Sequence, residues 1–419
     1  MIEQEKGRVV YNLVTYFMLL GIAVASMFSK KVRKMWRGER HAFEVLRGKV
    51  DPDARYIWFH AASLGEFEQG RPLMERIREE HPEYKILLTF FSPSGYEVRK
   101  NYKGADIICY MPVDTPTNAH RFLRLVHPEM AFFIKYEFWY NYLHILAKSH
   151  IQVYSVSSIF RPEQVFFKWY GRQYGKVLKC ITRFFVQNEE SLNLLAGIGL
   201  TNAEIVGDTR FDRVLQIKAA AKRLPIVDSF VNGCDGNRRQ VFVAGSSWAP
   251  DEDIFISFFN QHKNWKLIIA PHVIGEDHLQ QICSKLDRKT VRYTKTTPEE
   301  ASSAECLIVD CFGLLSSIYH YGQISYVGGG FGVGIHNTLE AGVWGIPVIF
   351  GPNNKNFQEA QGLLKVKGGF EIKDKNDFAV VMECLTNDQK ILETSGKKAS
   401  DFVTSLAGAT DKILKEIKF

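Results

Sequence analysis

Short runs of consecutive apolar residues alternate along most of the chain with longer stretches of helical character. Such runs are typical of strands buried on both faces of a parallel sheet. In the first half we expect strands at Tyr56–His60, Lys85–Phe91, Asp106–Met111, Met130–Ile134, Val153–Ser157 and Phe184–Gln187. The second half repeats the scheme at Val241–Gly245, Leu267–Pro271, Val291–Thr294, Leu307–Asp310, Ile324–Val327 and Pro347–Phe350. The pattern predicts an α/β protein with two doubly wound domains.

Length and composition agree with two globular domains. A chain of 419 residues is too long for one core, and 46% hydrophobic with 24% charged residues is typical of folded proteins. We place the boundary in the polar stretch 207–239, which predicts domains at 31–212 and 213–400 with a cleft between them. A last helix, Asp401–Lys418 within 401–419, is expected to pack back across the junction.

The first thirty residues differ from the rest. Val9–Phe28 carries no charge over twenty positions, which is long enough to span a bilayer. A basic block follows: Lys30, Lys31, Arg33, Lys34, Arg37 and Arg40. The positive-inside rule then places everything after residue 30 in the cytoplasm. We expect residues 1–30 to be an uncleaved inner-membrane anchor; a helix lying in the membrane plane and a cleaved signal peptide are the alternatives.

Net charge and cysteine content indicate which partners and which cellular compartment to expect. The basic block accounts for much of the net charge of +7 and suits an anionic membrane surface. We expect no nucleic-acid partner, because the globular part has no comparable basic run with aromatic residues. The seven cysteines are scattered without a C-x-x-C pair, which favours reduced thiols in the cytosol over a zinc site or disulfides.

A glycine cluster follows the expected strand Ile324–Val327. It contains Gly328, Gly329, Gly330, Gly332 and Gly334, and we expect a helix to start around 336–337. Glycines let the backbone approach a ligand, and a helix N-terminus offers N–H groups to an anion. No window matches G-x-G-x-x-G, so NAD and FAD are not indicated. A glycine-rich turn without a ligand is the alternative, but His336 and Glu340 would share the helix face beside the glycines.

Five segments together resemble the Kdo transferases. They are HAASLGE (60–66), FIKYEFWYN (133–141), VGDTRFDR (206–213), AGSSWAPDE (244–252) and GGGFGVGIHNTLEAGVWGIPVIFGPNNKNFQEA (328–360). That family transfers 3-deoxy-D-manno-octulosonic acid (Kdo) from CMP-Kdo to the lipid A precursor at the inner membrane. The resemblance runs in order over nearly the whole chain. It implies a GT-B fold, in which two Rossmann-like domains face a cleft, an inverting mechanism, and no metal or cofactor.

The resemblance also assigns catalytic roles in the first domain. Glu66 matches the general base that takes the proton from the acceptor hydroxyl. Glu137, beside Lys135, matches a second essential acid, and Arg210 matches a basic residue that stabilises transition-state charge. The alternatives are a helix-capping role for Glu66, a solvated rim for Glu137, and a surface salt bridge from Arg210 to Asp208 or Asp212.

In the second domain the resemblance assigns the CMP-binding residues. Asn337, Thr338, Leu339 and Glu340 match the N-x-L-E segment that holds CMP. Pro271 and His272 align with a family Pro-Arg, and Phe312, Gly313 and Leu314 with a family Met-Gly-Glu. Here His272 replaces a cation and Leu314 a carboxylate. The D-x-D matches at Asp51 and Asp251 are not placed to bind a metal. A GT-B enzyme using a UDP-sugar and a nucleotide-sugar-binding protein without catalysis are the alternative functions.

Overall fold

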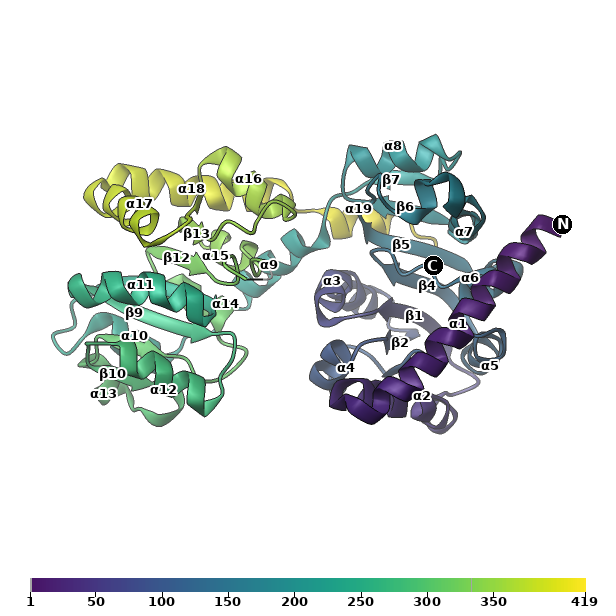
Figure 1. The fold of residues 1–419 in the computed structure, drawn as a ribbon, viewed down its shortest axis with the longest axis horizontal. Helices are drawn as coiled ribbons and strands as arrows, with labels where there is room; N and C mark the ends of the chain where they lie inside the picture. Colours follow the sequence, from purple (N-terminus) through teal and green to yellow (C-terminus); the bar gives the residue numbers. More distant parts are fainter. Residues whose placement is uncertain (1, 333) are drawn as a thin grey trace. The chain divides into compact units, whose positions relative to one another are not determined.

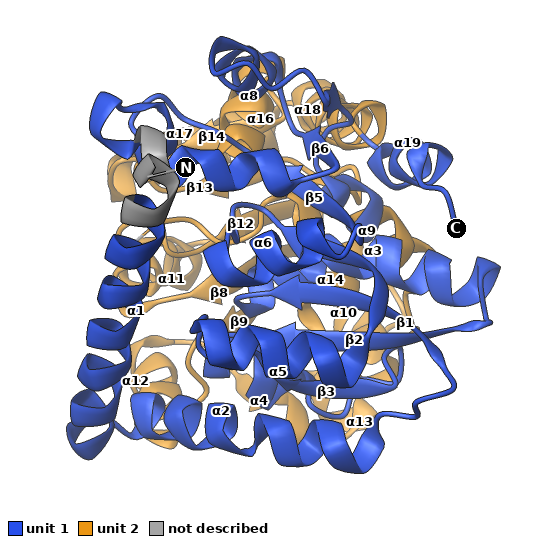
Figure 2. Ribbon diagram, turned by 90° about the vertical axis from the view of Figure 1, so that its right-hand side faces the viewer, with its two compact units in different colours: residues 1–213, 407–419 blue, residues 214–406 orange. Residues whose placement is uncertain are grey.

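The computed structural model describes residues 2–332 and 334–419, which form two compact units (Figure 2). Unit 1 comprises Met1–Arg213 and Ala407–Phe419, and unit 2 comprises Val214–Leu406. Val333, within the glycine cluster, and the side chains of residues 2–6, 172 and 173 lie outside the described part. Unit 1 is therefore built from two separate stretches of the chain.

Unit 1 contains a seven-stranded parallel sheet in the order β3-β2-β1-β4-β5-β6-β7 (Figure 1). The strands are β1 (Arg55–Ala61), β2 (Tyr84–Phe90), β3 (Ile107–Tyr110), β4 (Pro128–Ile134), β5 (Gln152–Ser158), β6 (Arg183–Val186) and β7 (Ala203–Ile205). The α-helices are α1 (Ile2–Phe28), α2 (Lys30–Lys49), α3 (Leu64–Glu80), α4 (Pro93–Arg99), α5 (Pro116–Val126), α6 (Tyr140–Lys148), α7 (Arg172–Gly175), α8 (Glu189–Gly197) and α19 (Ala409–Glu416). Helix α9 (Thr209–Ala219) contains the unit boundary.

Unit 2 repeats the plan with a second seven-stranded parallel sheet, β10-β11-β9-β8-β12-β13-β14. Its strands are β8 (Gln240–Ser247), β9 (Trp265–Pro271), β10 (Thr290–Arg292), β11 (Cys306–Ile308), β12 (Ile324–Val327), β13 (Val348–Phe350) and β14 (Gly369–Glu371). Its helices are α10 (Pro225–Asn232), α11 (Ala249–Gln261), α12 (Glu276–Lys285), α13 (Pro298–Ser302), α14 (Leu315–Ile318), α15 (Leu339–Gly342), α16 (Gln358–Val366), α17 (Lys375–Asn387) and α18 (Gln389–Ser405).

Both sheets are buried on their two faces. In unit 1, Trp58 and Phe133 face one apolar cluster, and Phe59 and Phe132 face the other. Unit 2 has the same two-sided core around β8, β9 and β12. The expected pair of doubly wound parallel sheets is therefore confirmed.

The direction of the strand order reverses between β1 and β4 in unit 1 and between β8 and β12 in unit 2. In open parallel sheets, a ligand binds in the crevice outside the carboxyl ends of the strands at such a switch point. The segments that leave these four strands are Ala62–Leu64, Lys135–Trp139, Trp248 and the glycine cluster. They include or adjoin four of the five segments singled out in the sequence.

Three expectations about elements need correction. The edge strands β7 and β14 were absent from the expected set; each is only three residues long. The helix expected from Asp401 to Lys418 is in fact broken: α18 ends at Ser405, and α19 begins after Gly408, whose φ of +100° interrupts a right-handed helix. The helix expected at 336–337 is the single turn α15, because the Asn337 side chain accepts the N–H of Leu339 (3.2 Å) and holds the preceding backbone in a turn.

Helix α1 presents its apolar side away from unit 1. Gly7–Phe28 is long and apolar enough to cross a membrane, by length and composition alone. The exposed apolar side chains on it are Val9, Val10, Leu13, Val14, Tyr16, Phe17, Leu20, Val24, Met27 and Phe28. The inward stripe is more polar and includes buried Thr15 and Ser26. This orientation is the reverse of that of a surface helix in a water-soluble protein.

Polar contacts hold the first half of α1 against unit 1. The Tyr11 hydroxyl donates to the buried carboxylate of Asp114 (2.7 Å), and Asn141 Nδ2 donates to Asn12 Oδ1 (2.9 Å). Asp114 also accepts the backbone N–H groups of Asn141 and Tyr142 at the start of α6 (3.0 and 3.1 Å). The Tyr11 ring stacks on Tyr174 with centroids 5.7 Å apart. Helix α1 is thus attached to the α5–α6 side of the domain (Figure 1).

Candidate active site

Glu66 and Glu137 lie at the switch point of unit 1. Glu66 is in the first turn of α3, directly after β1, and Glu137 follows β4, the neighbouring strand. Parallel pairing of β1 with β4 brings their carboxyl ends to the same edge of the sheet. One Glu66 oxygen accepts the backbone N–H of Ser63 (2.9 Å), so the capping contact considered from the sequence is present and orients this carboxylate.

The pKa of Glu66 is raised above its ordinary value. Burial is the main cause, and the negative charge of Glu137 is the second; Lys135 and His60 act in the opposite direction. Two carboxylates close enough to affect each other, with the pKa of one raised, are typical of acid–base sites. A raised pKa also makes the ionised carboxylate a stronger base.

Glu137 is held by two aromatic neighbours. Trp139 Nε1 donates to its carboxylate (2.9 Å), and the Nε2 atom of His60 lies 3.5 Å from the same oxygen. His60 is fully buried at the end of β1, and its Nδ1 atom lies 2.9 Å from the Thr89 hydroxyl. The same hydroxyl accepts from Trp58 Nε1 (2.8 Å), so Thr89 fixes the His60 ring beside Glu137. The sequence analysis assigned no role to His60, although it is the first residue of HAASLGE.

Arg210 pairs with Asp208, as the alternative from the sequence anticipated. Its Nε and backbone N atoms donate to the two Asp208 oxygens at 2.8 and 2.9 Å. Asp208 is buried and also accepts from Gln69 of α3 (3.1 Å). Both Arg210 and Glu137 influence the Tyr136 hydroxyl electrostatically. The pair therefore lies near the edge that holds the glutamates, and the salt bridge fixes the guanidinium there.

Three non-glycine residues at carboxyl ends of strands adopt positive φ angles. They are Lys135 (62°) after β4, Ser157 (52°) in β5 and Ser246 (52°) in β8. This conformation costs an L-residue on the order of 1–3 kcal/mol and is retained mainly at functional sites. In unit 1, the Ser155 and Ser158 hydroxyls donate to the Lys135 carbonyl (3.2 and 2.7 Å) and stabilise its turn.

The glycine cluster of unit 2 is fixed by Asp251. This buried carboxylate accepts the N–H groups of Gly329 (3.0 Å) and Trp248 (2.9 Å) and the hydroxyl of Tyr326 (2.7 Å). Asp251 thus ties the turn after β12 to the start of α11. Its D-x-D partner, Asp253, instead forms a salt bridge with Lys285 (2.7 Å).

The glycines have different surroundings. A Cβ atom on Gly330 would lie 2.6 Å from the Gly351 backbone, and one on Gly328 would lie 2.3 Å from the Ser246 carbonyl. These two positions need glycine for packing. A Cβ atom on Gly332 would meet only the Gly329 carbonyl at 3.7 Å, an ordinary contact. Gly332 is therefore the position whose substitution tests a ligand without disturbing the turn.

The N-x-L-E segment forms a small hydrogen-bonded group. Asn337 Nδ2 donates to Glu340 Oε1 (3.1 Å), and the Ser316 hydroxyl donates to Glu340 Oε2. Thr338 and Leu339 are buried, so they support the turn from behind. The structure therefore leaves Asn337 and Glu340 as the half-buried members of this segment. Ser316, one turn into α14, was not singled out in the sequence.

Three rings stack at the carboxyl ends of β8, β9 and β12. The His272 ring stacks on both Trp248 and His336, with centroid distances of 4.6 and 4.4 Å. Trp248 Nε1 donates to His336 Nε2 (3.1 Å), which requires that nitrogen to be unprotonated. Burial lowers the pKa of His272, and burial together with His272 lowers that of His336 to about 4. Both imidazoles are therefore neutral at neutral pH.

The remaining donor candidates lie on the neighbouring strands. Pro271 is the last residue of β9, and the His272 backbone N–H donates to the Ser247 carbonyl (2.9 Å). Phe312 follows β11 with 74% of its surface exposed, and Gly313 has a φ of +89°. Leu314 is half-buried and precedes α14. Among the described residues, no group of three or more His, Cys, Asp or Glu side chains is arranged to hold a metal ion.

Comparison with known proteins shows what the chain resembles. Residues 36–213 match the family model described as 3-deoxy-D-manno-octulosonic-acid transferase (kdotransferase). The chain is therefore similar to the Kdo transferases, and curated relatives extend this similarity over most of its length. A 3-deoxy-D-manno-octulosonic acid transferase of Aquifex aeolicus is 27% identical over 351 residues, which cover 81% of this chain and 89% of the relative. One from Haemophilus influenzae is 23% identical over 386 residues, covering 88% and 87%.

Solved structures support the fold. UDP-GlcNAc 2-epimerase from Neisseria meningitidis, bound to UDP-GlcNAc, has a TM-score of 0.62 and 12% sequence identity, covering 86% of this chain and 98% of that one. At this identity the likeness concerns the fold alone. Together with the two parallel sheets, it shows the GT-B-type architecture of this chain.

Proposed function

We propose that this glycosyltransferase transfers Kdo from CMP-Kdo to a lipid A precursor with inversion at the anomeric carbon. Similarity to the Kdo transferases supports the Kdo transfer itself. The observation that carries the mechanism is the pair Glu66 and Glu137 at the switch point of unit 1, with the pKa of Glu66 raised by burial and by its neighbour. An inverting transfer needs one positioned base, and Glu66 fits that role.

In the proposed reaction, an acceptor hydroxyl oxygen attacks the anomeric carbon of Kdo while the bond from that carbon to the CMP phosphate oxygen breaks. The bonding electrons leave with CMP, and the hydroxyl proton passes to the Glu66 carboxylate. Glu137, contacted by Trp139 and His60, lies beside it and helps to raise the pKa of Glu66. Arg210, fixed by Asp208, stabilises the negative charge that develops.

We assign donor binding to unit 2. The backbone around Gly332 and the Asn337–Glu340 pair would hold the CMP group, with the Glu340 carboxylate accepting from ribose hydroxyls. His272 is neutral, so it cannot replace the family's arginine as a cation. Its stacking on Trp248 and His336 instead suits it to contact the donor through its ring.

Substitution of the base tests this proposal. Glu66→Gln should lower turnover with CMP-Kdo by about 10²-fold or more while CMP affinity stays unchanged, because Glu66 lies in unit 1. Glu79→Gln is the matched control: it is an exposed glutamate near the end of the same helix. Near-normal turnover of Glu66→Gln would remove the assignment. Tighter binding of UMP or UDP than of CMP in calorimetric titrations would favour a UDP-sugar donor.

We further infer that α1 lies along the membrane surface. Its apolar side chains point away from unit 1, whereas Tyr11 and Asn12 are bonded to α6 and Asp114. A helix that crossed the bilayer would have to break these contacts or draw the domain into the lipid. The structure thus favours the in-plane alternative over the spanning anchor, and the basic block of α2 would meet anionic headgroups.

The side of the membrane on which the N-terminus lies distinguishes an in-plane α1 from a membrane-spanning α1. In vesicles with the catalytic units outside, an epitope tag before Met1 should be cut by added protease if α1 lies in the plane. Protection of the tag would establish a spanning helix. Leu13→Gln with Phe17→Gln should weaken vesicle flotation, whereas Val98→Gln, at an exposed apolar residue of α4, should leave it unchanged.

A further inference from the structure

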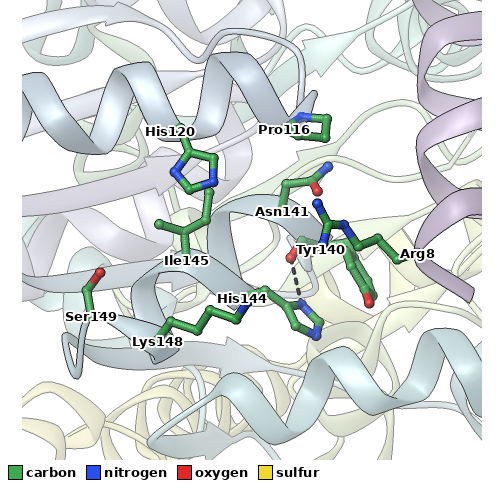
Figure 3. A pocket seen from close by; sticks show the side chains of 9 residues that line it. All are labelled: Arg8, Pro116, His120, Tyr140, Asn141, His144, Ile145, Lys148 and Ser149. Carbon is green, nitrogen blue, oxygen red and sulfur yellow. Dashed lines mark hydrogen bonds between the residues drawn. The ribbon is translucent and has the colours of Figure 1, made fainter. Parts of the chain in front are cut away.

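A hollow on the surface of unit 1 takes no part in the proposed reaction. It lies between α1, α5 and α6, and its lining includes Arg8, His120, Tyr140, Asn141, His144 and Lys148 (Figure 3). We call it the α1–α6 hollow. Its volume of about 240 Å³ is smaller than the roughly 300–1,000 Å³ of typical pockets for drug-sized ligands. It would accommodate a small polar group.

The hollow gathers basic side chains from three elements. Arg8 comes from α1, His120 from α5, and His144 and Lys148 from successive turns of α6, so they surround the same space (Figure 3). No carboxylate is among the lining residues. Within residues 7–419 with described side chains, neither Arg8 nor Lys148 forms an ion pair with an acid.

The neighbouring acid does not neutralise this charge. Asp114 lies behind Asn141 and is fully buried, and its oxygens already accept from Tyr11, Asn141 and Tyr142. It therefore has no surface in the hollow. The positive groups face solvent without a counter-charge, which is an arrangement that attracts an anion.

The His144 ring is held in a fixed position at the hollow. Its Nδ1 atom donates to the Tyr140 carbonyl (2.8 Å), and its ring stacks on Tyr140 with centroids 3.9 Å apart. These contacts fix the ring and leave Nε2 for another partner. Burial lowers the pKa of His144, and the positive charges of Lys148 and Arg8 add to that effect. The negative charge of a bound anion would raise the pKa of His144 and favour its protonated imidazole, which can donate to the anion.

We propose that the α1–α6 hollow binds a phosphate group, supplied either by a lipid headgroup or by phosphate in solution. Arginine, lysine and histidine together match the charge and the acceptor oxygens of phosphate. The lipid source fits because exposed Val9 and Val10 adjoin Arg8 on α1. The lipid headgroup as the source depends on α1 lying in the membrane plane. Binding of a phosphate group in the hollow does not depend on that arrangement.

Titrations of the full chain in a neutral detergent test the hollow. The probes are inorganic phosphate, a water-soluble short-chain phosphatidylglycerol, and the matching diacylglycerol without phosphate. Lys148→Gln and His120→Gln should each weaken binding of the phosphate probes by about tenfold, the usual effect of losing one charged hydrogen bond. Lys103→Gln is the control, since this exposed lysine also forms no ion pair among the described side chains. Melting temperatures verify that the variants fold.

Each outcome decides the proposal. Tighter binding of phosphatidylglycerol than of inorganic phosphate, lost in both hollow variants, supports a headgroup site. Equal or exclusive binding of inorganic phosphate with the same losses supports a site for soluble phosphate. If neither inorganic phosphate nor phosphatidylglycerol binds, the proposal is wrong. The proposal is also wrong if Lys148→Gln and His120→Gln leave the affinity for the phosphate probes unchanged, as the control Lys103→Gln should.

Discussion

At the scale of single residues, the candidate chemistry depends on how burial and neighbouring charge alter side chains that are ordinary in sequence. Glu66 is a first-turn helix glutamate and Glu137 a loop glutamate, yet burial and the adjacent Glu137 together raise the pKa of Glu66. His272 and His336 would be partly charged in water, but desolvation at the site lowers the pKa of both, and His272 lowers that of His336 further. The fold therefore raises the proton affinity of one side chain, Glu66, and lowers that of two others, His272 and His336.

The pH dependence of turnover should report the Glu66 pKa. Glu66 acts only when deprotonated and its pKa is raised, so activity is lost as pH falls through a value above the ordinary 4.5. Glu137→Gln removes the second cause of that shift. The acid limb of kcat/KM should therefore move to lower pH in this variant, whatever its absolute rate. A limb that stays in place would show that the two carboxylates do not interact.

Two glycine substitutions should separate ligand contact from packing. Gly332→Val adds a side chain where the protein offers only an ordinary contact, so the melting temperature should be kept. CMP binding should weaken by about tenfold or more, equivalent to about 1.4 kcal/mol. Gly330→Val places Cβ against the Gly351 backbone and should lower stability itself. Unchanged CMP affinity in folded Gly332→Val would place the nucleotide elsewhere.

The residues predicted from the sequence stand in local motifs, whereas the residues that were missed depend on partners distant in the sequence. Glu66, Glu137 and Arg210 were predicted because they stand in recognisable motifs next to strand ends. His60 and Ser316 were missed because each acts through a partner distant in sequence, Glu137 and Glu340 respectively. A histidine inside an apolar strand and a serine in a short helix carry no signal until the fold supplies those partners.

At the scale of elements, side-chain caps tie together segments that are far apart in the chain. Asp212, early in α9, accepts the N–H groups of Gly408 and Thr410 (2.5 and 2.7 Å) and the Thr410 hydroxyl (2.6 Å). It thereby caps α19, whose position the sequence pattern did not indicate. The expected continuous helix overlooked Gly408, which lets the chain turn so that Ile413 and Ile417 enter the core of unit 1.

Loss of this cap should destabilise unit 1. Asp212→Ala removes three hydrogen bonds at the start of α19 and should lower the free energy of unfolding by about 1–3 kcal/mol. Asp411→Ala is the control, because Asp411 is 60% exposed and forms only a surface ion pair with Arg76 (2.8 Å). That change should cost less than about 1 kcal/mol. Equal effects in chemical denaturation would contradict the capping role.

Strand prediction succeeded for the buried central strands and missed two of the four edge strands, β7 and β14. The central strands β1, β4, β8 and β12 are apolar runs that cannot be mistaken for loops. By contrast, β7 and β14 have the sequences AEI and GFE and are only partly buried. Their strand conformation depends on pairing with β6 and β13, which is a tertiary contact. No local pattern of three residues contains that information.

At the scale of the whole molecule, each unit has its own two-sided core, and the family motifs divide between them. Unit 1 contains Glu66, Glu137 and Arg210, and unit 2 contains the glycine cluster and Asn337–Glu340. The catalytic pair and the proposed nucleotide site are therefore on separately folded bodies. Unit 2 is one continuous stretch of chain, whereas unit 1 includes the C-terminal residues 407–419.

Truncation after Leu406 should affect the two units differently. The shortened chain keeps every proposed catalytic and donor-binding residue but loses α19 with its buried Ile413 and Ile417. Burial of each isoleucine contributes about 1.5–3 kcal/mol, so the unfolding transition of unit 1 should move to lower temperature. The transition of unit 2 and its affinity for CMP should be unchanged. Equal shifts of both transitions in calorimetry would show that α19 serves the molecule as a whole.

The divided composition of unit 1 has a consequence for the order in which the protein matures on the ribosome. Domains fold as units while the chain is being synthesised, generally from the N-terminus. Here the earlier unit must wait, because its capping helix is translated only after the whole of unit 2. During that interval Asp212 has no helix to cap, and the positions of Ile413 and Ile417 in the core of unit 1 are unfilled. The N-terminal unit thus becomes complete only after unit 2 has been synthesised, so a chain terminated before residue 407 would carry an unfinished unit 1 that quality-control proteases can recognise.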